Sequence, residues 1–553
     1  MAVAAIQEAI PDSAQPAPAG PANANQQVER APDRFPVYAI DVLGVTKLPA
    51  GEVERLIYPY LGPDKSGPDI EAARAAIQKA YTDRGYEAVV VEIPAQTTER
   101  FAQGIVELRV SEAPVGQVRV VENKYHSAGG VRSQVPSVRE GQPLNLQALQ
   151  RDIEVANQFP DRQVTPSFKP GTEPGTIDVD LTVQDKFPLH SSVELNNDNS
   201  PSTERLRLVG NTRYTDVWGL GHTASIGFVL SPEDRHQSSV ISGSYLAPLQ
   251  GTPWSVLVYG YRSNSNIAAL GGTNVLGNGY QIGLRAIYRV PSRDSVQSVS
   301  FGPDYKSFKQ DILVGIVNAA STPIRYVPLT LEYNFASTDD ESAFAKAFGP
   351  SSFDATFGTT FGVRAIKRVI CFDHDNDPRT PCLPVDQFQN REVDSFENFV
   401  HFNAGFNYSL ATKNDFILAT RASMQLADSH LVTNEQFSAG GISSVRGYLQ
   451  SEAVGDDGYV SGLELQSPSL GPEVGPWLSD LRFYGFVDSG VVRIRRAQPG
   501  QRSRYSLIGA GAGFRIRLLD KLSGEMVLAI PLTDGLQTQK GDTRTVFVVR
   551  GEF

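Results

Sequence analysis

Apolar residues recur along the chain at two different spacings, and the spacing changes near Phe187. Before that point, segments repeat apolar residues every three or four positions, which predicts amphipathic helices. The two clearest helical faces are Ile70, Ala73, Ile77 and Tyr81, and then Leu146, Leu149, Ile153 and Ala156. After Phe187 the spacing becomes two, which indicates β-strands with different environments on their two faces, and no helix is predicted from there on.

The part before Phe187 contains two modules with the same order of elements, β-α-α-β-β. We expect strands at 37–44, 84–93 and 104–110 in the first module, and at 116–122, 162–170 and 176–185 in the second. An element order that repeats with a period of about 75 residues indicates a tandem repeat of one small domain. The predicted boundaries are 1–34 for an N-terminal segment, 35–113 and 114–186 for the modules, and 187–553 for the rest.

The strands after Phe187 each separate an uncharged face from a polar one. In residues 507–519 the uncharged face is Ile508, Ala510, Ala512, Phe514, Ile516 and Leu518, and the other is Gly509, Gly511, Gly513, Arg515 and Arg517. About 16 such segments fit before the chain ends, at about 23 residues for each strand with its connection. Short and long connections alternate, and the last strand ends in an aromatic residue, Phe553. These features favour an antiparallel transmembrane barrel over a large soluble all-β protein.

Composition narrows the functional classes. The net charge is −11 and the pI about 5.3, which argues against a general nucleic-acid binder. The mean hydropathy is −0.23, and no apolar run approaches the roughly 20 residues of a membrane helix. Low hydropathy is compatible with a barrel, whose strands are apolar on one face only.

The two cysteines, Cys371 and Cys382, lie close together in one segment. Their spacing suits an oxidising compartment and one small loop-closing disulfide. Asp373, Asp375 and Asp377 alternate between them and resemble the start of a calcium loop. The glycine and distant glutamate of such a loop are missing, so a solvated acidic loop is favoured and a calcium site is the alternative.

The N-terminal segment lacks the basic and long apolar regions of a signal peptide, so we expect that any export signal has been removed or replaced. After Pro11 it reads as a Pro-rich linker. Residues 2–10 are a candidate for a short helix, and a disordered end is the alternative.

No catalytic or nucleotide-binding pattern stands out. The chain has no G-x-S-x-G and no G-x-x-x-x-G-K-[ST] motif. His190 and His222 fall at lumenal or turn positions without a nearby serine or cysteine pattern. We therefore expect no enzymatic activity and no cofactor.

One long connection, residues 443–459, carries the sequence Val445-Arg446-Gly447-Tyr448. A later strand carries Phe486-Val-Asp488-Ser-Gly490, and period-two alternation places Asp488 on the face shared by Arg482, Tyr484 and Phe486. A carboxylate on the lipid face of a barrel would cost a few kcal/mol, so this face is expected to line the lumen.

Together, two β-α-α-β-β modules, a VRGY loop and an F-x-D-x-G strand resemble the TpsB family of the Omp85 superfamily, the outer-membrane transporters of two-partner secretion. The resemblance covers residues 35–553 and implies two periplasmic POTRA modules followed by a 16-stranded antiparallel barrel with an inward-folded long loop. It also implies that Arg446 pairs with Asp488. We refer to seven residues as the loop lock: Val445, Arg446, Gly447, Tyr448, Phe486, Asp488 and Gly490.

The resemblance further implies a function. Such a protein recognises one large secreted TpsA-like partner, such as an adhesin or haemolysin, through its POTRA modules, and exports it unfolded without nucleotide hydrolysis. Phe547 and Phe553 would form the C-terminal signal read by the barrel-assembly machinery. Outer-membrane lipids are expected partners and nucleic acid is not. The principal alternative is an insertase for outer-membrane proteins, although insertases usually carry more modules; a passive porin is disfavoured because porins lack such modules. Arg446 could also act only as a structural staple between loop and wall.

Overall fold

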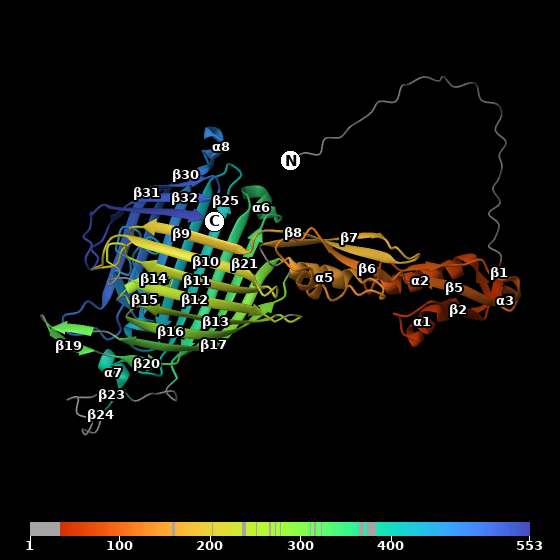
Figure 1. Cartoon of the computed structure of the whole chain (residues 1–553), viewed down its shortest axis with the longest axis horizontal. Helices are drawn as coiled ribbons and strands as arrows, with labels where there is room; N and C mark the ends of the chain where they lie inside the picture. Colours follow the sequence, from red (N-terminus) through yellow and green to blue (C-terminus); the bar gives the residue numbers. More distant parts are fainter. Residues whose placement is uncertain are drawn as a thin grey trace, which may run out of the picture. The chain divides into compact units, whose positions relative to one another are not determined.

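A computed structural model describes residues 34–157, 161–201, 203–234, 239–249, 251–264, 267–270, 273–276, 278–292, 294–309, 311–314, 317–321, 323–363, 370–372 and 383–553 (Figure 1). The described chain packs as two units. The first takes its residues from Met1–Gln117, Ser137–Gln150 and Lys169–Asp178. The second comprises Val118–Pro136, Arg151–Phe168 and Val179–Phe553, and it contains the barrel.

The first module has a three-stranded sheet in the order β2-β5-β4, in which β2 runs parallel and β4 antiparallel to β5. Beside it lies a two-stranded pair, β1-β3. The bounds are β1 (Arg34–Val37), β2 (Ala39–Leu43), α1 (Ala50–Ile57), η1 (Tyr58–Tyr60), β3 (Gly62–Ser66), α2 (Gly67–Thr82), β4 (Val90–Glu92), α3 (Thr98–Ala102) and β5 (Ile105–Ser111).

Helix α2 confirms the helical face predicted from the sequence. Its buried residues are Ile70, Ala73, Ile77, Ala80 and Tyr81. The helix begins with a capping box, in which Ser66 and Asp69 bond reciprocally and satisfy amide groups that the first turn leaves free. Among the described helices, none is long and apolar enough to cross a membrane.

The second module repeats the arrangement with a sheet ordered β6-β8-β7. Leu149 and Ala156 of its longer helix are buried, as the apolar spacing predicted. The bounds are β6 (Val115–Val121), α4 (Ala128–Ser133), α5 (Leu146–Ala156), β7 (Arg162–Pro170) and β8 (Ile177–Asp185).

The remaining strands close into an antiparallel barrel (Figure 1). Strands β20 and β21 both pair with β17 and occupy one position, so the described strands fill 16 positions. The bounds are β9 (Leu189–Asn196), β10 (Arg207–Val217), β11 (His222–Leu230), β12 (Ser239–Pro248), β13 (Trp254–Ser263), β16 (Asn278–Val290), β17 (Ser295–Lys309), β20 (Ile324–Tyr326), β21 (Leu329–Asp339), β22 (Ser351–Phe361), β25 (Val400–Ala411), β26 (Ile417–Ala427), β29 (Asp457–Gln466), β30 (Leu478–Arg493), β31 (Arg504–Leu518), β32 (Leu522–Pro531) and β33 (Arg544–Glu552).

The barrel closes where the last strand, β33, pairs with the first, β9. Both phenylalanines singled out in the sequence lie at this seam. The Phe553 amide donates to the Ser191 carbonyl at 2.8 Å, and the Phe547 amide donates to Asn197 Oδ1 at 2.8 Å. These two residues therefore contribute backbone bonds to closure.

Burial along β30 confirms the alternation of faces. Phe483 and Val487 are 50% and 54% exposed, whereas the neighbouring Phe486 and Asp488 are buried. Because successive side chains of a strand point to opposite faces, the exposed set faces lipid and the buried set faces the lumen.

Two expectations need correction. The strand expected at 84–93 is only β4, Val90–Glu92, because Tyr86–Val89 is a turn region packed on α2. Helices do occur after Phe187, but they lie in connections and are three to six residues long, which is less than two turns and too short for a helical apolar period. They are α6 (Ala343–Phe348), α7 (Gln387–Arg391), α8 (Gly471–Val474) and the 3-10 turn η3 (Thr433–Glu435).

The candidate helix at 2–10 and the linker lie outside the described residues, as do Asp373, Asp375, Asp377 and Cys382. Cys371 belongs to β23 (Ile370–Phe372), which pairs with β24 (Leu383–Val385), but its side chain is not described. The disulfide and the calcium alternative therefore stay predictions.

A charge on the lipid face of β30 should destabilise the barrel. We expect Val487→Arg to lower the free energy of unfolding by about 2–4 kcal/mol, because the guanidinium would face hydrocarbon near the middle of the strand. The measurement is denaturant unfolding of the protein in phospholipid vesicles. Ser423→Arg, which places the same charge at a residue lining the lumenal cavity, is the matched control. Equal losses for the two variants would contradict the assignment of faces.

Candidate functional site

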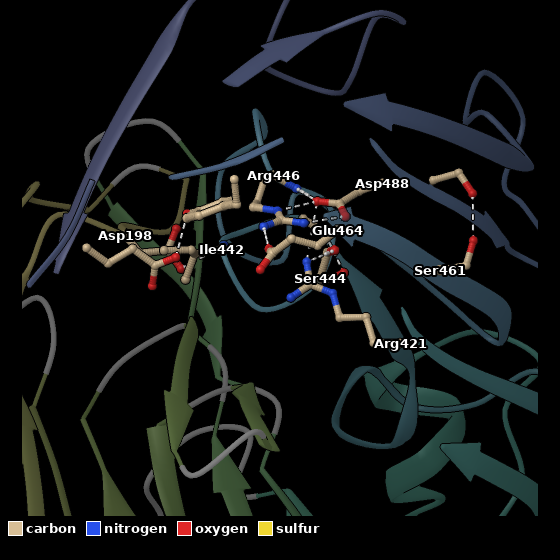
Figure 2. Close-up of polar contacts among 12 residues, drawn as sticks. Asp198, Arg421, Ile442, Ser444, Arg446, Ser461, Glu464 and Asp488 are labelled. Carbon is tan, nitrogen blue, oxygen red and sulfur yellow. Dashed lines mark hydrogen bonds and ion pairs between the residues drawn. The ribbon is translucent and has the colours of Figure 1, made fainter. Parts of the chain in front are cut away.

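The connection between β26 and β29, residues 428–456, is the sixth external connection of the barrel and is called loop 6 here. Within it, η3 is followed by a short antiparallel pair, β27 (Phe437–Ala439) and β28 (Ala453–Gly455). The pair carries the tip, residues 440–452, which contains Arg446. Figure 2 shows this tip directed at side chains from the barrel wall.

Arg446 makes a bidentate contact with Asp488 of β30 (Figure 2). Its Nε lies 2.7 Å from Oδ2 and its Nη2 lies 2.9 Å from Oδ1, while its backbone amide donates to Oδ2 at 3.1 Å. The guanidinium carbon lies 3.5 Å from the centroid of the Phe486 ring, a cation–π distance. The Asp488 side chain is fully buried, so this contact replaces the water that the carboxylate has lost.

The contact belongs to a larger charge network. Arg446 Nη1 lies 2.5 Å from Glu464 of β29, and Glu464 also binds Arg515 of β31 at 2.5 Å. The remaining contacts are Arg421 to Asp488 at 3.3 Å and Arg515 to Glu525 at 3.0 Å. Three arginines thus meet three carboxylates on the lumenal wall, which keeps the cluster neutral.

Glycines on both sides of Asp488 make room for the loop. Asp488 lies opposite Gly462 of β29 and Gly509 of β31. A Cβ on Gly509 would come within 1.9 Å of the Arg446 carbonyl oxygen, and one on Gly462 within 2.5 Å of Asp488 Oδ1. A side chain at either position would therefore displace the loop tip or the carboxylate.

The residues that flank Arg446 fix the tip to the wall. Val445 is buried against Gly490, where a Cβ would come within 2.9 Å of the valine side chain. The Tyr448 hydroxyl lies 3.0 Å from the Ile508 carbonyl oxygen and 2.7 Å from that of Thr533. Gly447 has φ +100°, a left-handed conformation that favours glycine.

A second anchor, formed by Glu435, attaches loop 6 to a different part of the wall. The buried Glu435 carboxylate lies 2.6 Å from Lys306 Nζ of β17 and 3.4 Å from His401 Nε2 of β25. It also accepts a hydrogen bond from the Tyr326 hydroxyl of β20. At the other side of the barrel, the Ile442 amide of the loop tip donates to Asp198, just after β9, at 3.2 Å (Figure 2). The loop therefore contacts residues from β17 round to the connection that follows β9.

The base of loop 6 and its tip have further carboxylate contacts. Asp456 accepts from the amides of Leu431 and Arg495, both at 2.8 Å, and lies 2.9 Å from His430 Nδ1. Glu452 accepts from the amides of Gln537 and Thr538 in the connection before β33, at 2.8 and 2.7 Å. The loop is therefore held at its base, at its tip and from a neighbouring connection.

Loop 6 forms one side of a polar cavity of about 1030 Å³ inside the barrel. Its lining includes Asp198, His401, Gln425, Glu435 and Ser444. The arrangement therefore places a loop, held by charged contacts, within the lumen.

All seven predicted loop-lock residues meet at one place in the structure. Sequence reasoning missed Glu464, Arg421, Arg515 and Glu435. Period-two alternation already put Arg515 on the polar face of its strand, but no sequence signal identified which acidic side chain it would meet. His190 and His222 contact Asp161 and Tyr245, each at 2.6 Å, and neither lies against a nucleophile in these contacts.

The sequence models of two known families match the chain. Residues 333–516 match the haemolysin secretion/activation protein ShlB/FhaC/HecB family, and residues 35–113 match the POTRA domain of ShlB type.

Individual transporters are similar to the chain over most of its length. The outer membrane transporter CdiB of Escherichia coli is 23% identical over 90% of this chain and 79% of its own length. The heme/hemopexin transporter protein HuxB of Haemophilus influenzae is 20% identical over 91% of this chain and 85% of its own length. The structure of CdiB from Escherichia coli superposes with a TM-score of 0.61 at 19% identity, covering 96% of this chain and 93% of that one.

A 16-stranded barrel with POTRA-type modules and a loop bound inside its lumen defines the Omp85-like class of outer-membrane proteins. Within that class, the chain is similar to the ShlB/FhaC/HecB family, the TpsB transporters of two-partner secretion, over residues 333–516 and, in its POTRA domain, over residues 35–113. It is an outer-membrane transporter that secretes partner proteins, and the family is one of transporters, not enzymes.

Contacts at the base of loop 6 should depend on pH. The hydrogen bond to Asp456 raises the pKa of His430 above its usual 6.5 against the opposing effect of burial, and the charges of Asp456, Glu392 and Asp394 act in the same direction. A raised pKa in the folded state means that the contribution to stability is complete below about pH 6.5 and is lost as the pH rises through the raised value. We expect protease cleavage at 428–436 in the folded protein to accelerate from about pH 6 to about pH 9.

The measurement is the cleavage rate by one protease, divided at each pH by its rate on a free peptide of the same sequence. His430→Asn keeps a hydrogen-bond donor without a titratable group, so its normalised rate should be flat across this range. The same pH dependence in both proteins would show that another group is responsible.

Proposed function

We propose that this transporter recognises one dedicated, large TpsA-like protein in the periplasm through its POTRA modules and passes it, unfolded, through the barrel to the cell surface. Export would use no nucleotide hydrolysis and would draw on folding of the partner outside the cell. The observation that carries the proposal is the loop lock, which holds loop 6 inside the lumen through a contact that other side chains or a passing chain can replace.

The buried loop supports a transport cycle with two states. Loop 6 lines the polar cavity of about 1030 Å³, so a translocating polypeptide and the seated loop compete for the same lumenal space. The contacts that hold the loop are ion pairs and hydrogen bonds to polar wall residues. A passing chain offers amides and carbonyls that can bind those same wall residues once the loop has moved.

The modules offer surfaces suited to an extended peptide. Strand β7 lies at the edge of its sheet, in the order β6-β8-β7, and β4 lies at the edge of the other. An edge strand presents amide and carbonyl groups that its own sheet does not pair, to which an extended chain can add by β-augmentation. On β4 those of Val91 are bonded by Gln78 and Arg74, and on β7 those of Val164 are bonded by Asn157, so the part of β7 after Val164 is the favoured surface. Capture in this form would keep the partner unfolded before it enters the barrel.

Four further assignments are part of the proposal. The functional units are an N-terminal segment at 1–34, POTRA modules at 35–113 and 114–186, and a barrel at 187–553. Residues 2–10 are the candidate for a plug helix, with a disordered end as the alternative. Cys371 and Cys382 form a disulfide in an external connection, and Phe547 and Phe553 form the signal read by the barrel-assembly machinery.

Deletion of the gene separates this proposal from an insertase. We expect one large protein to disappear from the culture medium or cell surface, with other outer-membrane barrels unchanged, when mutant and parent are compared by quantitative mass spectrometry. This result is expected because the pore is proposed to serve a single partner. A general loss of outer-membrane barrels, with no single missing secreted protein, would instead establish an insertase.

The loop lock should be required for export. Arg446→Ala and Asp488→Ala should each strongly reduce the secreted partner while folded barrel persists in the membrane. Removing one member of a buried pair costs about 3–5 kcal/mol, because the other charge is left without a partner and the loop loses its defined seat. Export is measured by immunoblotting the medium, and folding by heat-modifiable migration of the barrel.

The matched control is Arg482→Ala. Arg482 lies on β30, the strand that carries Asp488, but its guanidinium binds Asp415 at 2.9 Å, away from loop 6. We expect near-normal export from this control. Normal export by both lock variants would rule out a role for the lock in transport and leave it a structural staple.

A further inference from the structure

The connection between β30 and β31 carries an unusual concentration of positive charge. Residues 493–504 contain five arginines and no acidic residue, in a chain whose net charge is −11. Two of the five have acidic partners: Arg495 binds Asp457 at 2.9 Å and Arg496 binds Asp394 at 3.3 Å. Arg493, Arg502 and Arg504 are exposed and form no ion pair with any residue in the described parts of the chain.

Arg493 and Arg504 lie directly opposite each other, at the last register position of the β30–β31 ladder. Side chains in such positions have Cβ atoms about 5 Å apart, and two like charges there repel. The acidic residue in register with Arg493 on the other side, Asp457, is already bound by Arg495 and by the Ala427 amide at 2.9 Å. The protein itself therefore leaves this pair of charges without compensation.

The pair points out of the barrel, toward lipid. Arg493 shares its strand face with the exposed Phe483 and Val487 and lies on the face opposite the buried Asp488. Arg504 pairs with it across the ladder and so lies on the same outer surface. One step nearer the middle of the membrane, that surface carries Val491 and, in register with it, the exposed Tyr459.

The two arginines also lie at the external end of the barrel. β30 and β31 are joined here by the connection at 494–503, on the same side as loop 6, whereas β9 enters the barrel from the second POTRA module at the opposite end. The ladder thus ends where the outer leaflet meets water, with cations above an apolar and aromatic surface. A lipid with an anionic head group has the complementary arrangement.

We propose that Arg493 and Arg504, with Arg502 two residues earlier in the chain than Arg504, bind the phosphate groups of a phosphorylated glycolipid in the outer leaflet. A phosphate between the two guanidiniums would accept hydrogen bonds from both and convert a repulsive pair into an attractive site. The acyl chains would lie along Val491 and Tyr459. The lipid would fix the β30–β31 pair, whose strand β30 carries Asp488, against the membrane boundary.

The test measures binding of fluorescent diphosphorylated lipid A to the purified full-length protein in detergent. Arg493→Gln combined with Arg504→Gln should weaken binding at least about tenfold, because each guanidinium makes a charge-assisted contact with phosphate that the neutral amide cannot replace. The matched control is Arg517→Gln combined with Lys521→Gln, which removes two exposed positive charges at the other end of the same barrel wall. Its binding should equal that of the parent.

Two competitors identify the ligand. Lipid A stripped of its phosphates should fail to displace the probe, and sodium phosphate at the same phosphate concentration should displace little of it. Equal binding by the arginine double variant and the parent would overturn the proposal, as would full competition by the stripped lipid. Full competition by sodium phosphate would overturn the lipid assignment and make the patch a site for free anions. If the arginine double variant bound lipid normally but failed to export the partner in the immunoblot assay, the patch would instead be a surface for the secreted chain.

The unfolding temperature, measured with and without lipid A, distinguishes loss of the lipid site from misfolding of the double variant. Without lipid, the arginine double variant should unfold at a temperature equal to or above that of the parent, because it lacks the repulsive pair. Added lipid A should raise the unfolding temperature of the parent and the control but not of the double variant. A lower unfolding temperature without lipid would show that the arginines serve the fold instead of a ligand.

Discussion

The interaction on which the site depends is the neutralisation of Asp488, a carboxylate with no exposure to solvent on the wall of a membrane barrel. Such a group is tolerated only if an opposite charge replaces its lost hydration. The two adjacent strands do not supply that charge at the same register position, because the residues opposite Asp488 are Gly462 and Gly509. Arg421 of β26 approaches Asp488 at 3.3 Å, but the bidentate contact comes from Arg446 of loop 6, so the position of a connection of 29 residues is tied to the electrostatic requirement of one side chain.

The requirement extends from Asp488 to further charged residues of the wall. Arg446 also binds Glu464, and Glu464 needs Arg515, which in turn binds Glu525. Each added charge has to be balanced, and the network ends only when three arginines face three carboxylates. Gly462 and Gly509 belong to the same arrangement, because the space they leave is where the Arg446 backbone and the Asp488 carboxylate meet.

The sequence predicted those features that a single strand or helix encodes. Period-two alternation was enough to put Asp488 in the lumen, and helical spacing was enough to find the buried face of α2. Partners from distant strands could not be predicted, because register between strands is not written in either strand alone. Lys306 and Glu435 are 129 positions apart, and only the closed barrel brings them together. The helices of three to six residues in the connections could not be predicted, because fewer than two turns give no apolar repeat.

The anchors of loop 6 differ in what can release them. The base contact between His430 and Asp456 contains a histidine, whose charge is lost as the pH rises through its raised pKa. At the tip, the guanidinium of Arg446 keeps its positive charge at any physiological pH, so a change of pH in that range does not neutralise Arg446. Tip release therefore requires competing groups that can bind Asp488 and Glu464 in its place, and inside the lumen a translocating polypeptide is a source of such groups. A loop whose base responds to protons and whose tip responds only to a competing ligand is suited to stay seated until a chain arrives.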